Sequence, residues 1–155
     1  MTVMADAVTF AGVTFAYDRS AVLEDVSFAV TPGEFFGLIG PNAAGKSTLL
    51  KLILGLLEPQ QGQVRVLGNE PCVARERIGY VPQFPTFSRN FPINVLDMVL
   101  LGRLGLGRTA GAFNAEDRAR AGKALRAVEI EPLGNTPIGE LSGGQLQRAL
   151  IARAL

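Results

Sequence analysis

Apolar residues in the first thirty positions alternate with polar or small ones. The alternating residues are Val8, Phe10, Val13, Phe15 and Tyr17 and, after a turn at residues 18–20, Val26, Phe28 and Val30. A period of two residues is typical of strands with one buried face. The pattern therefore predicts an antiparallel β layer, which ends at the turn residues Thr31-Pro32-Gly33-Glu34.

The pattern then changes twice. Phe35–Ile39 is apolar without alternation, as in a strand covered on both faces. A glycine-rich segment follows, and Lys46–Leu57 then carries apolar residues at helical spacing, namely Leu49, Leu50, Ile53, Leu56 and Leu57. The order strand, loop, helix is that of a phosphate-binding loop.

The remaining chain mixes short strands and capped helices. We expect strands at Gln63–Leu67 and Ile78–Val81, a helix opening at Asn94 and closing at Gly102, a helix from Asn114 to about Val128, and a connection over Glu131–Gly139. Asp97 and Asp117 stand three residues after their asparagines, as in a capping box. The chain is predicted to be of the α/β class.

Composition narrows the possible partners. Hydrophobic residues make up 48% and charged residues 19% of the 155 positions, which is typical of a globular protein. Fifteen Lys and Arg balance fourteen Asp and Glu with no basic block, so we expect no nucleic-acid partner. The single Cys72 fits a reducing compartment, the first ten residues lack a basic secretory region, and no apolar stretch reaches the ~20 residues of a membrane span.

A phosphate-binding motif occupies the expected loop. Its residues are Gly40, Pro41, Asn42, Ala43, Ala44, Gly45, Lys46, Ser47 and Thr48. In the pattern Gly-x-x-x-x-Gly-Lys-Ser/Thr, backbone N–H groups surround the phosphates, the lysine reaches the outer phosphates, and the hydroxyl binds Mg²⁺. We therefore expect ATP and Mg²⁺ as ligands, with Ser47 on the metal and Thr48 on the next phosphate. Ala43 would be strained by on the order of 1 kcal/mol if its position needs a positive φ.

A second short motif is Leu141-Ser142-Gly143-Gly144-Gln145. By itself, Ser142 is a good helix cap. The phosphate loop, then Val81-Pro82-Gln83, then this second motif follow one another along the chain. With these three segments in this order, the chain resembles the nucleotide-binding subunit of an ATP-binding-cassette (ABC) transporter. The resemblance covers essentially the whole chain and implies a P-loop ATPase fold with an inserted helical subdomain.

The resemblance also implies residue roles. Tyr17 would stack on adenine, with a buried core tyrosine as the competing interpretation. Gln83 would reach Mg²⁺ and the attacking water. Ser142, Gly143 and Gly144, with Gln145 completing the signature, would contact the γ-phosphate held by a second copy in a head-to-tail dimer. Lys46, Gln83 and Ser142 are thus the expected catalytic residues.

We expect a partial ABC domain, with residues 1–83 as nucleotide-binding core, 84–145 as helical subdomain and 146–155 as the start of the following helix. The family continues with a strand that carries a Mg²⁺-binding aspartate, a catalytic glutamate and, further on, a switch histidine. The sequence contains no histidine. The chain is therefore expected to lack the carboxy-terminal part of the sheet, and to bind nucleotide without hydrolysing it.

The segments Arg89–Asp97 and Leu100–Arg103 resemble subunits that energise zinc and manganese importers. Siderophore and cobalamin importers have related segments, and a non-transport ABC protein or a regulatory module is a further alternative. The importer assignment implies a transmembrane permease partner, an indirect periplasmic or surface metal-binding protein, and a place on the cytoplasmic face of the cell membrane. Phe84, Phe87 and Phe91 either pack the subdomain or line a groove for the permease.

Overall fold

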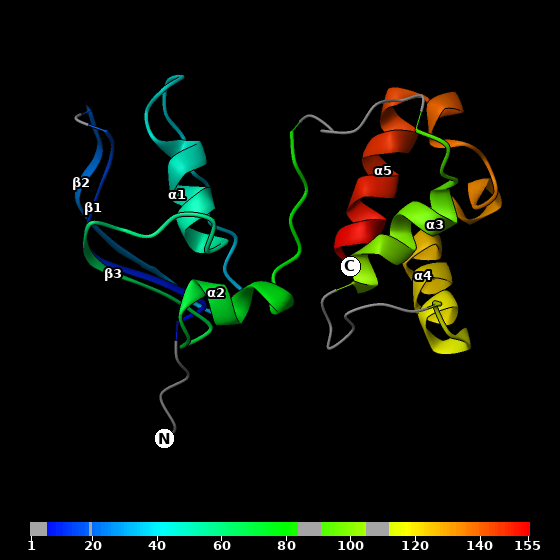
Figure 1. Ribbon diagram of the computed structural model, residues 1–155, viewed down its shortest axis with the longest axis horizontal. Coiled ribbons are helices and arrows are strands. Elements are labelled where there is room, and N and C mark those ends of the chain that lie inside the picture. The colour runs from blue at the N-terminus through cyan, green and yellow to red at the C-terminus, as the bar shows by residue number, and fades with distance from the viewer. Residues whose placement is uncertain (1–5, 19, 84–90, 105–111) are drawn as a thin grey trace. The chain divides into compact units, whose positions relative to one another are not determined.

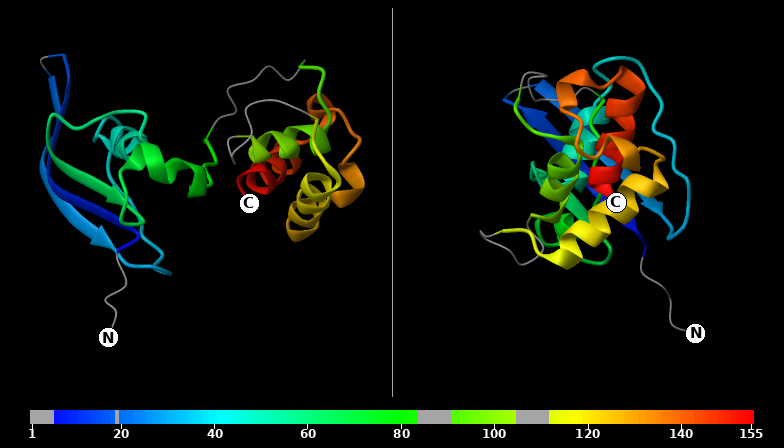
Figure 2. Two further views of the ribbon diagram at one scale, coloured as in Figure 1. Left: turned by 60° about the horizontal axis from the view of Figure 1, so that its bottom comes forward. Right: turned by 90° about the vertical axis from the view of Figure 1, so that its right-hand side faces the viewer.

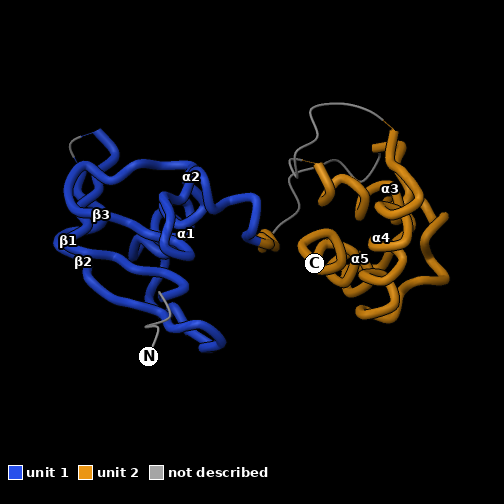
Figure 3. Tube along the Cα trace, turned by 90° about the horizontal axis from the view of Figure 1, so that it is seen from below, with its two compact units in different colours: residues 1–78 blue, residues 79–155 orange. Residues whose placement is uncertain are grey.

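The computed structural model describes residues 6–18, 20–83, 91–104 and 112–155 (Figure 1). The chain forms two compact units, Met1–Ile78 and Gly79–Leu155, each with its own apolar core (Figure 3). Within the described ranges, no helix is both long and apolar enough to cross a bilayer. The finer division predicted from the sequence, at residues 83 and 145, stays a prediction.

Three antiparallel strands form the sheet of the first unit. They are β1 (Val8–Tyr17), β2 (Ser20–Val30) and β3 (Gln61–Val66), in the order β2-β1-β3. The predicted antiparallel β layer is confirmed. Strand β3 begins two residues earlier than predicted. It ends at Val66, one residue before the predicted end, because Leu67 takes a left-handed φ of 50°.

An irregularity in β1 explains a phase shift in its sequence. Phe10 and Val13 are both buried although they are three residues apart, which a regular strand does not allow. The register with β2 shifts between these residues, the register with β3 shifts between Ala11 and Thr14, and Gly12 in both intervals has a φ of 61°. The extra residue returns Val13 and Phe15 to the buried face.

Helices cover one face of this sheet (Figure 2). They are α1 (Lys46–Ile53) and α2 (Pro71–Ala74), the latter followed by a 3-10 turn at Arg75–Arg77. The core joins buried residues of both layers, among them Phe10, Val13, Phe15, Leu23, Leu49, Leu52, Val64, Val66 and Ala74. The short helix α2 was not predicted.

Helix α1 ends four residues before the predicted Leu57. Gly55 has a φ of 64°, its N–H donates to the carbonyl of Leu52, and the N–H of Leu56 donates to the carbonyl of Lys51. This pair of hydrogen bonds is a Schellman motif, which terminates a helix at a left-handed glycine.

Two predicted strands are wrong as stated. Phe35–Ile39 and Ile78–Val81 belong to no strand of the described chain, and the side chains of Phe35 and Ile39 are 99% and 95% exposed. A strand needs backbone partners at its sides, and no described strand pairs with either segment. The turn before Phe35 is nevertheless ordered, since the backbone N–H and then the hydroxyl of Thr31 donate to Glu34 and lower the pKa of its carboxyl.

The second unit is helical. Its elements are α3 (Val95–Leu100), a 3-10 turn at Leu101–Arg103, α4 (Ala115–Ala127), 3-10 turns at Glu131–Leu133 and Ile138–Glu140, and α5 (Gly143–Ala154). The predicted caps are confirmed: the side chain of Asn94 accepts from the N–H of Asp97, and Asn114 with Asp117 forms a full capping box. Phe84, Phe87, Arg89 and Asn90, which the sequence analysis singled out, lie outside the described residues.

The three helices pack around one core, to which α3 contributes four buried residues, namely Val95, Met98, Val99 and Leu100. The connection before α5 is fixed by backbone hydrogen bonds: Val95 N–H donates to Thr136, Leu96 N–H to Gly134, and Ile138 N–H to Ile93. Arg148 of α5 donates to the carbonyl of Val128 at 3.3 Å and to Glu129 at 3.4 Å. The second motif is therefore held by α3 and by the end of α4.

Replacing Gly62 by alanine should destabilise the first unit more than the same change at Gly33. Both glycines have a φ near 80°, but a Cβ on Gly62 would lie 2.3 Å from the carbonyl oxygen of Gly12, whereas one on Gly33 meets nothing within 4 Å. Left-handed backbone strain costs about 1 kcal/mol at both sites, and the clash adds about 1–3 kcal/mol at Gly62. Urea unfolding followed by circular dichroism measures both; equal losses would contradict the close contact.

Candidate nucleotide-binding site

Helix α1 begins at a glycine that touches the neighbouring strand. Gly45 is the N-cap residue, with a φ of 81°. A Cβ there would lie 3.1 Å from the carbonyl oxygen of Val22 and 3.0 Å from the side chain of Leu23, both in β2. Only glycine meets the positive φ and the close approach together, so the loop reaches the helix with its backbone pressed against the sheet.

The first turn of α1 offers unused hydrogen-bond donors. No side chain caps this end of the helix, and the first helical hydrogen bond runs from Leu49 to Gly45. The backbone N–H groups of Lys46, Ser47 and Thr48 therefore have no acceptor among the described residues, and no acidic residue stands in this turn. Helices α3, α4 and α5 differ in that a side chain caps each of them. Uncapped donors at a helix start favour an anion.

Lys46 brings a positive charge to the loop that precedes this helix. Its ammonium donates to the carbonyl of Gly40 at 2.7 Å and to that of Pro41. Two neutral carbonyls leave the charge uncompensated, so a phosphate is a stronger partner for it. Ser47 is exposed, whereas Thr48 is buried. Ser47 can therefore present its hydroxyl to a metal ion, and Thr48 is placed to act through its backbone N–H.

Ala43 takes the conformation that the sequence analysis identified as costly. Its φ is 66°, in the left-handed region where a Cβ residue is disfavoured. The next residue, Ala44, does not have a positive φ, and its N–H donates to the carbonyl of Pro41 within the loop. The strain belongs to one residue of the loop rather than to the loop as a whole.

Tyr17 ends β1, and its side chain is 42% exposed. This exposure excludes the competing interpretation of a buried core tyrosine. The ring of the buried Phe15 meets the Tyr17 ring edge-on, with centroids 4.9 Å apart at 84°. The structure therefore presents an aromatic surface in the same unit as the phosphate loop, and adenine stacking stays a prediction.

The other predicted residues belong to the second unit. Gln83 lies in an exposed bend before the undescribed residues 84–90. Ser142 caps α5 by accepting from the N–H of Gln145 at 3.3 Å, while the carboxamide oxygen of Gln145 accepts from the N–H of Ser142 at 2.8 Å. The capping role of Ser142 is confirmed. Because the hydroxyl accepts in this cap, its hydrogen remains available for another acceptor.

Among the described residues, nothing requires glycine at positions 143 and 144. Both are exposed at the start of α5, neither has a positive φ, and a Cβ on either would meet nothing within 4 Å. Glycine weakens a helix relative to alanine by about 0.5–1 kcal/mol. The absence of both side chains therefore favours close approach by something outside the chain.

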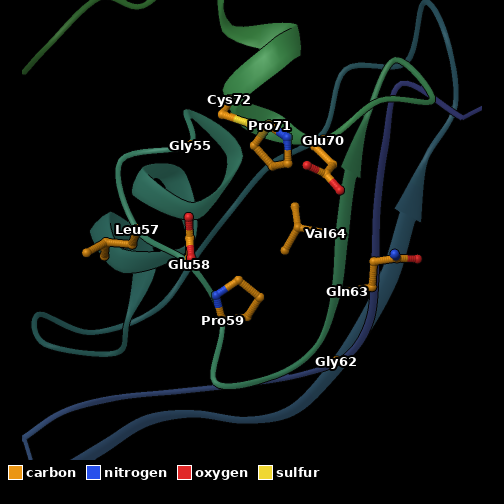
Figure 4. A pocket seen from close by; sticks show the side chains of 10 residues that line it. All are labelled: Gly55, Leu57, Glu58, Pro59, Gly62, Gln63, Val64, Glu70, Pro71 and Cys72. Carbon is orange, nitrogen blue, oxygen red and sulfur yellow. The ribbon is translucent and has the colours of Figure 1, made fainter.

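Each unit has a hollow among its described residues that lies apart from the phosphate loop. One, of about 300 Å³, lies between the end of α1, β3 and α2, and Figure 4 shows its ten lining residues, none of which belongs to the loop. The other, of about 210 Å³, is in the second unit and is lined by Phe91, Ile93, Met98, Leu101, Ile138 and Arg153. Phe91 is exposed at its edge, so it is available for a partner as well as for packing.

Comparison with known proteins identifies the class. The model of the ABC transporter family matches residues 23–155, so the chain belongs to that family. It is 46% identical over 148 residues to the manganese transport system ATP-binding protein MntB of Listeria innocua serovar 6a, covering 93% of this chain and 60% of the relative. It is 42% identical over 149 residues to the high-affinity zinc uptake system ATP-binding protein ZnuC of Bacillus subtilis strain 168, covering 96% and 64%.

Solved structures agree with this class. An inward-facing putative metal-chelate type ABC transporter superposes with a TM-score of 0.82 at 35% identity, over 97% of this chain and 56% of that one. The ADP conformation of the ATP-binding cassette MJ1267 gives 0.81 at 26% identity, over 97% and 64%. The P-loop ATPase fold is thus confirmed, and the chain spans about three fifths of the length of the curated relatives named above.

Two residues near the site were missed in the sequence analysis. Lys51 of α1 places its ammonium 6.0 Å from the centroid of the Tyr17 ring, and the side chain of Gln60 makes two hydrogen bonds to the backbone of Ala16. Both contacts join residues more than thirty positions apart along the chain. No local pattern signals such a contact, because it depends on how β1 folds against α1 and β3.

Replacing Ala43 by glycine should raise the free energy of unfolding by up to about 1 kcal/mol, since left-handed strain is removed and only partly offset by the freedom of glycine in the unfolded chain. Ala44→Gly is the matched control and should lower it by about 0.5–1 kcal/mol, because no positive φ is relieved there. Thermal unfolding of both variants measures the difference. A loss at Ala43 equal to that at Ala44 would contradict the strain.

Proposed function

We propose that the chain is the MgATP-binding part of an ATPase subunit that powers import of manganese or zinc ions. The observation that carries this proposal is the uncapped start of α1, where three backbone donors have no acceptor among the described residues, the ammonium of Lys46 contacts the preceding loop, and Ser47 is exposed. Membership of the ABC transporter family and the similarity to MntB and ZnuC support it.

The chemistry assigned to the complete subunit is attack of water on the γ-phosphate. Phosphoryl transfer depends on positioning and on neutralising charge rather than on covalent chemistry by the protein. Lys46 and the N–H groups of α1 would hold the outer phosphates, and Ser47 with Gln83 would hold Mg²⁺. The bound metal ion neutralises phosphate charge. An exposed hydroxyl in the first helical turn and an exposed carboxamide suit a hard cation that prefers oxygen ligands.

A second copy of the chain is the proposed partner for the signature motif. Ser142 keeps a free hydroxyl hydrogen, and Gly143 and Gly144 leave the start of α5 open to close approach. An anion held by another subunit fits such a helix start. In a head-to-tail pair each copy would contribute these groups to the γ-phosphate of the other.

The proposed setting is a membrane transport complex. The relatives named above are ATP-binding proteins of manganese transport and zinc uptake systems. We therefore assign a transmembrane permease as the direct partner, a periplasmic or surface metal-binding protein as an indirect one, and the cytoplasmic face of the membrane as the location. The exposed Phe91, at the edge of an apolar hollow, is a candidate contact for the permease.

Lys46→Ala should weaken MgATP binding about ten- to hundredfold, because a charge-assisted hydrogen bond to phosphate is lost. Lys123→Ala removes one positive charge from an exposed position of α4 and should leave binding unchanged. Isothermal titration of MgATP into each chain measures the affinities. Equal binding by parent and Lys46→Ala would refute the assignment of the phosphate loop.

Gly144→Ala should weaken the association of two copies without lowering the stability of the chain. Its Cβ enters open space, so the stability of the chain should stay equal or rise by up to about 1 kcal/mol through better helix propensity. Association of two copies in MgATP should weaken severalfold, because the methyl group stands between α5 and the phosphate of the partner. Sedimentation with and without MgATP measures this. Unchanged MgATP-dependent association would count against a signature that faces a second copy.

A further inference from the structure

Contacts from β1, from α1 and from the segment before β3 involve Tyr17 or the residue that precedes it. Its backbone follows Ala16, whose N–H and carbonyl are both hydrogen-bonded by the side chain of Gln60, at 3.0 and 3.3 Å. The N–H of Gln60 in turn donates to the carbonyl of Thr14 at 3.0 Å. These three hydrogen bonds join the end of β1 to the start of β3 and therefore fix the backbone next to Tyr17.

The ring has two neighbours of note. The ring of the buried Phe15 lies perpendicular to it, with centroids 4.9 Å apart, and the ammonium of Lys51 lies 6.0 Å from its centroid. Lys51 makes no ion pair with the described residues, so its charge is not drawn to a carboxylate. A cation at this distance is attracted by the electron-rich face of an aromatic ring. Much of the ring nevertheless stays accessible, with 42% of Tyr17 exposed.

Lys51 also belongs to the helix that carries the phosphate loop. It follows Lys46 by five residues in α1, about 7.5 Å along the axis at 1.5 Å per residue. One short helix therefore holds the phosphate donors at its start and the cation beside Tyr17 in its last turn. Helix α1 would therefore set the distance between the bound phosphates and the base of a nucleotide.

We infer that Lys51 is a positioning residue for the nucleotide base: it occupies one face of Tyr17, fixes the ring, and leaves the opposite face for adenine. The inference rests on the nucleotide binding proposed above and deepens it. The cation draws electron density from the tyrosine ring, which favours stacking of an electron-rich purine on the free face. Lys51 thereby acts on the base through Tyr17 and does not touch the phosphates.

Two other roles for Lys51 make different predictions. A lysine in the last turn of a helix stabilises that helix through the partial negative charge of the free carbonyls, which would change stability but not base affinity. A lysine that covers the face used by the base would instead compete with adenine, and its removal would tighten binding. The variants Lys51→Met, which keeps the length of the side chain, and Lys51→Arg, which keeps the charge, separate these roles.

The experiment measures binding of MgATP and of magnesium tripolyphosphate, which lacks a base, to the 155-residue chain and its variants by isothermal titration. Lys51→Met should weaken MgATP about two- to fivefold, leave tripolyphosphate unchanged, and be rescued by Lys51→Arg. In a Tyr17→Leu background the Lys51→Met change should have no further effect. Because Lys51 is exposed, all variants should keep the circular dichroism spectrum of the parent.

Several results would overturn the inference. An equal loss for tripolyphosphate would assign Lys51 to the phosphates, tighter MgATP binding by Lys51→Met would show that the lysine covers the stacking face, and unchanged MgATP binding would leave it a helix-end charge. A parent chain that binds neither ligand would overturn the proposed nucleotide binding itself. A parent that binds both, with no effect at Lys51, would overturn this inference alone.

Discussion

The contact between Gly45 and β2 is the constraint on which the first unit depends. A Cβ on Gly45 would crowd Val22 and Leu23, and the backbone turns here through a left-handed residue directly against the sheet and enters α1 without a capping side chain. That entry leaves three N–H groups without an acceptor among the described residues, and it sets Leu49 and Leu52 into the core shared with Phe10 and Val13. Packing and the proposed anion binding thus depend on the same backbone turn.

In the second unit, helix α5 differs from α1 because side chains cap its start. Here Ser142 and Gln145 form a reciprocal cap, and the hydrogen bonds of residues 93–96 with 134–138 hold the connection that leads to it. The helix start is therefore well defined without help from Gly143 or Gly144. Alanine would suit the fold better at these two positions, so the two glycines fit the second copy proposed above as a partner for this helix start. Stability and association place different demands on the same four residues.

The misassigned segment Phe35–Ile39 shows where sequence pattern alone fails. A continuous apolar run correctly indicates residues suited to burial on both faces, yet burial requires neighbours that the run itself does not provide. No described strand pairs with it, and its side chains are exposed. At the end of α1 a local signal was present in the sequence but was not used. Apolar spacing predicted a helix as far as Leu57, whereas Gly55 ends it.

The sequence by itself determined the features that arise from neighbouring residues: the alternation of β1 and β2, the caps at Asn94, Asn114 and Ser142, the phosphate loop, and the cost at Ala43. These depend on φ, ψ and hydrogen bonds within a few positions, which residue type largely controls. Only the tertiary structure decided the bulge at Gly12, the hydrogen bonds of Gln60 to Ala16, and the place of Lys51 beside Tyr17. Each joins residues distant in the chain, and such contacts follow from how whole elements pack rather than from any local pattern.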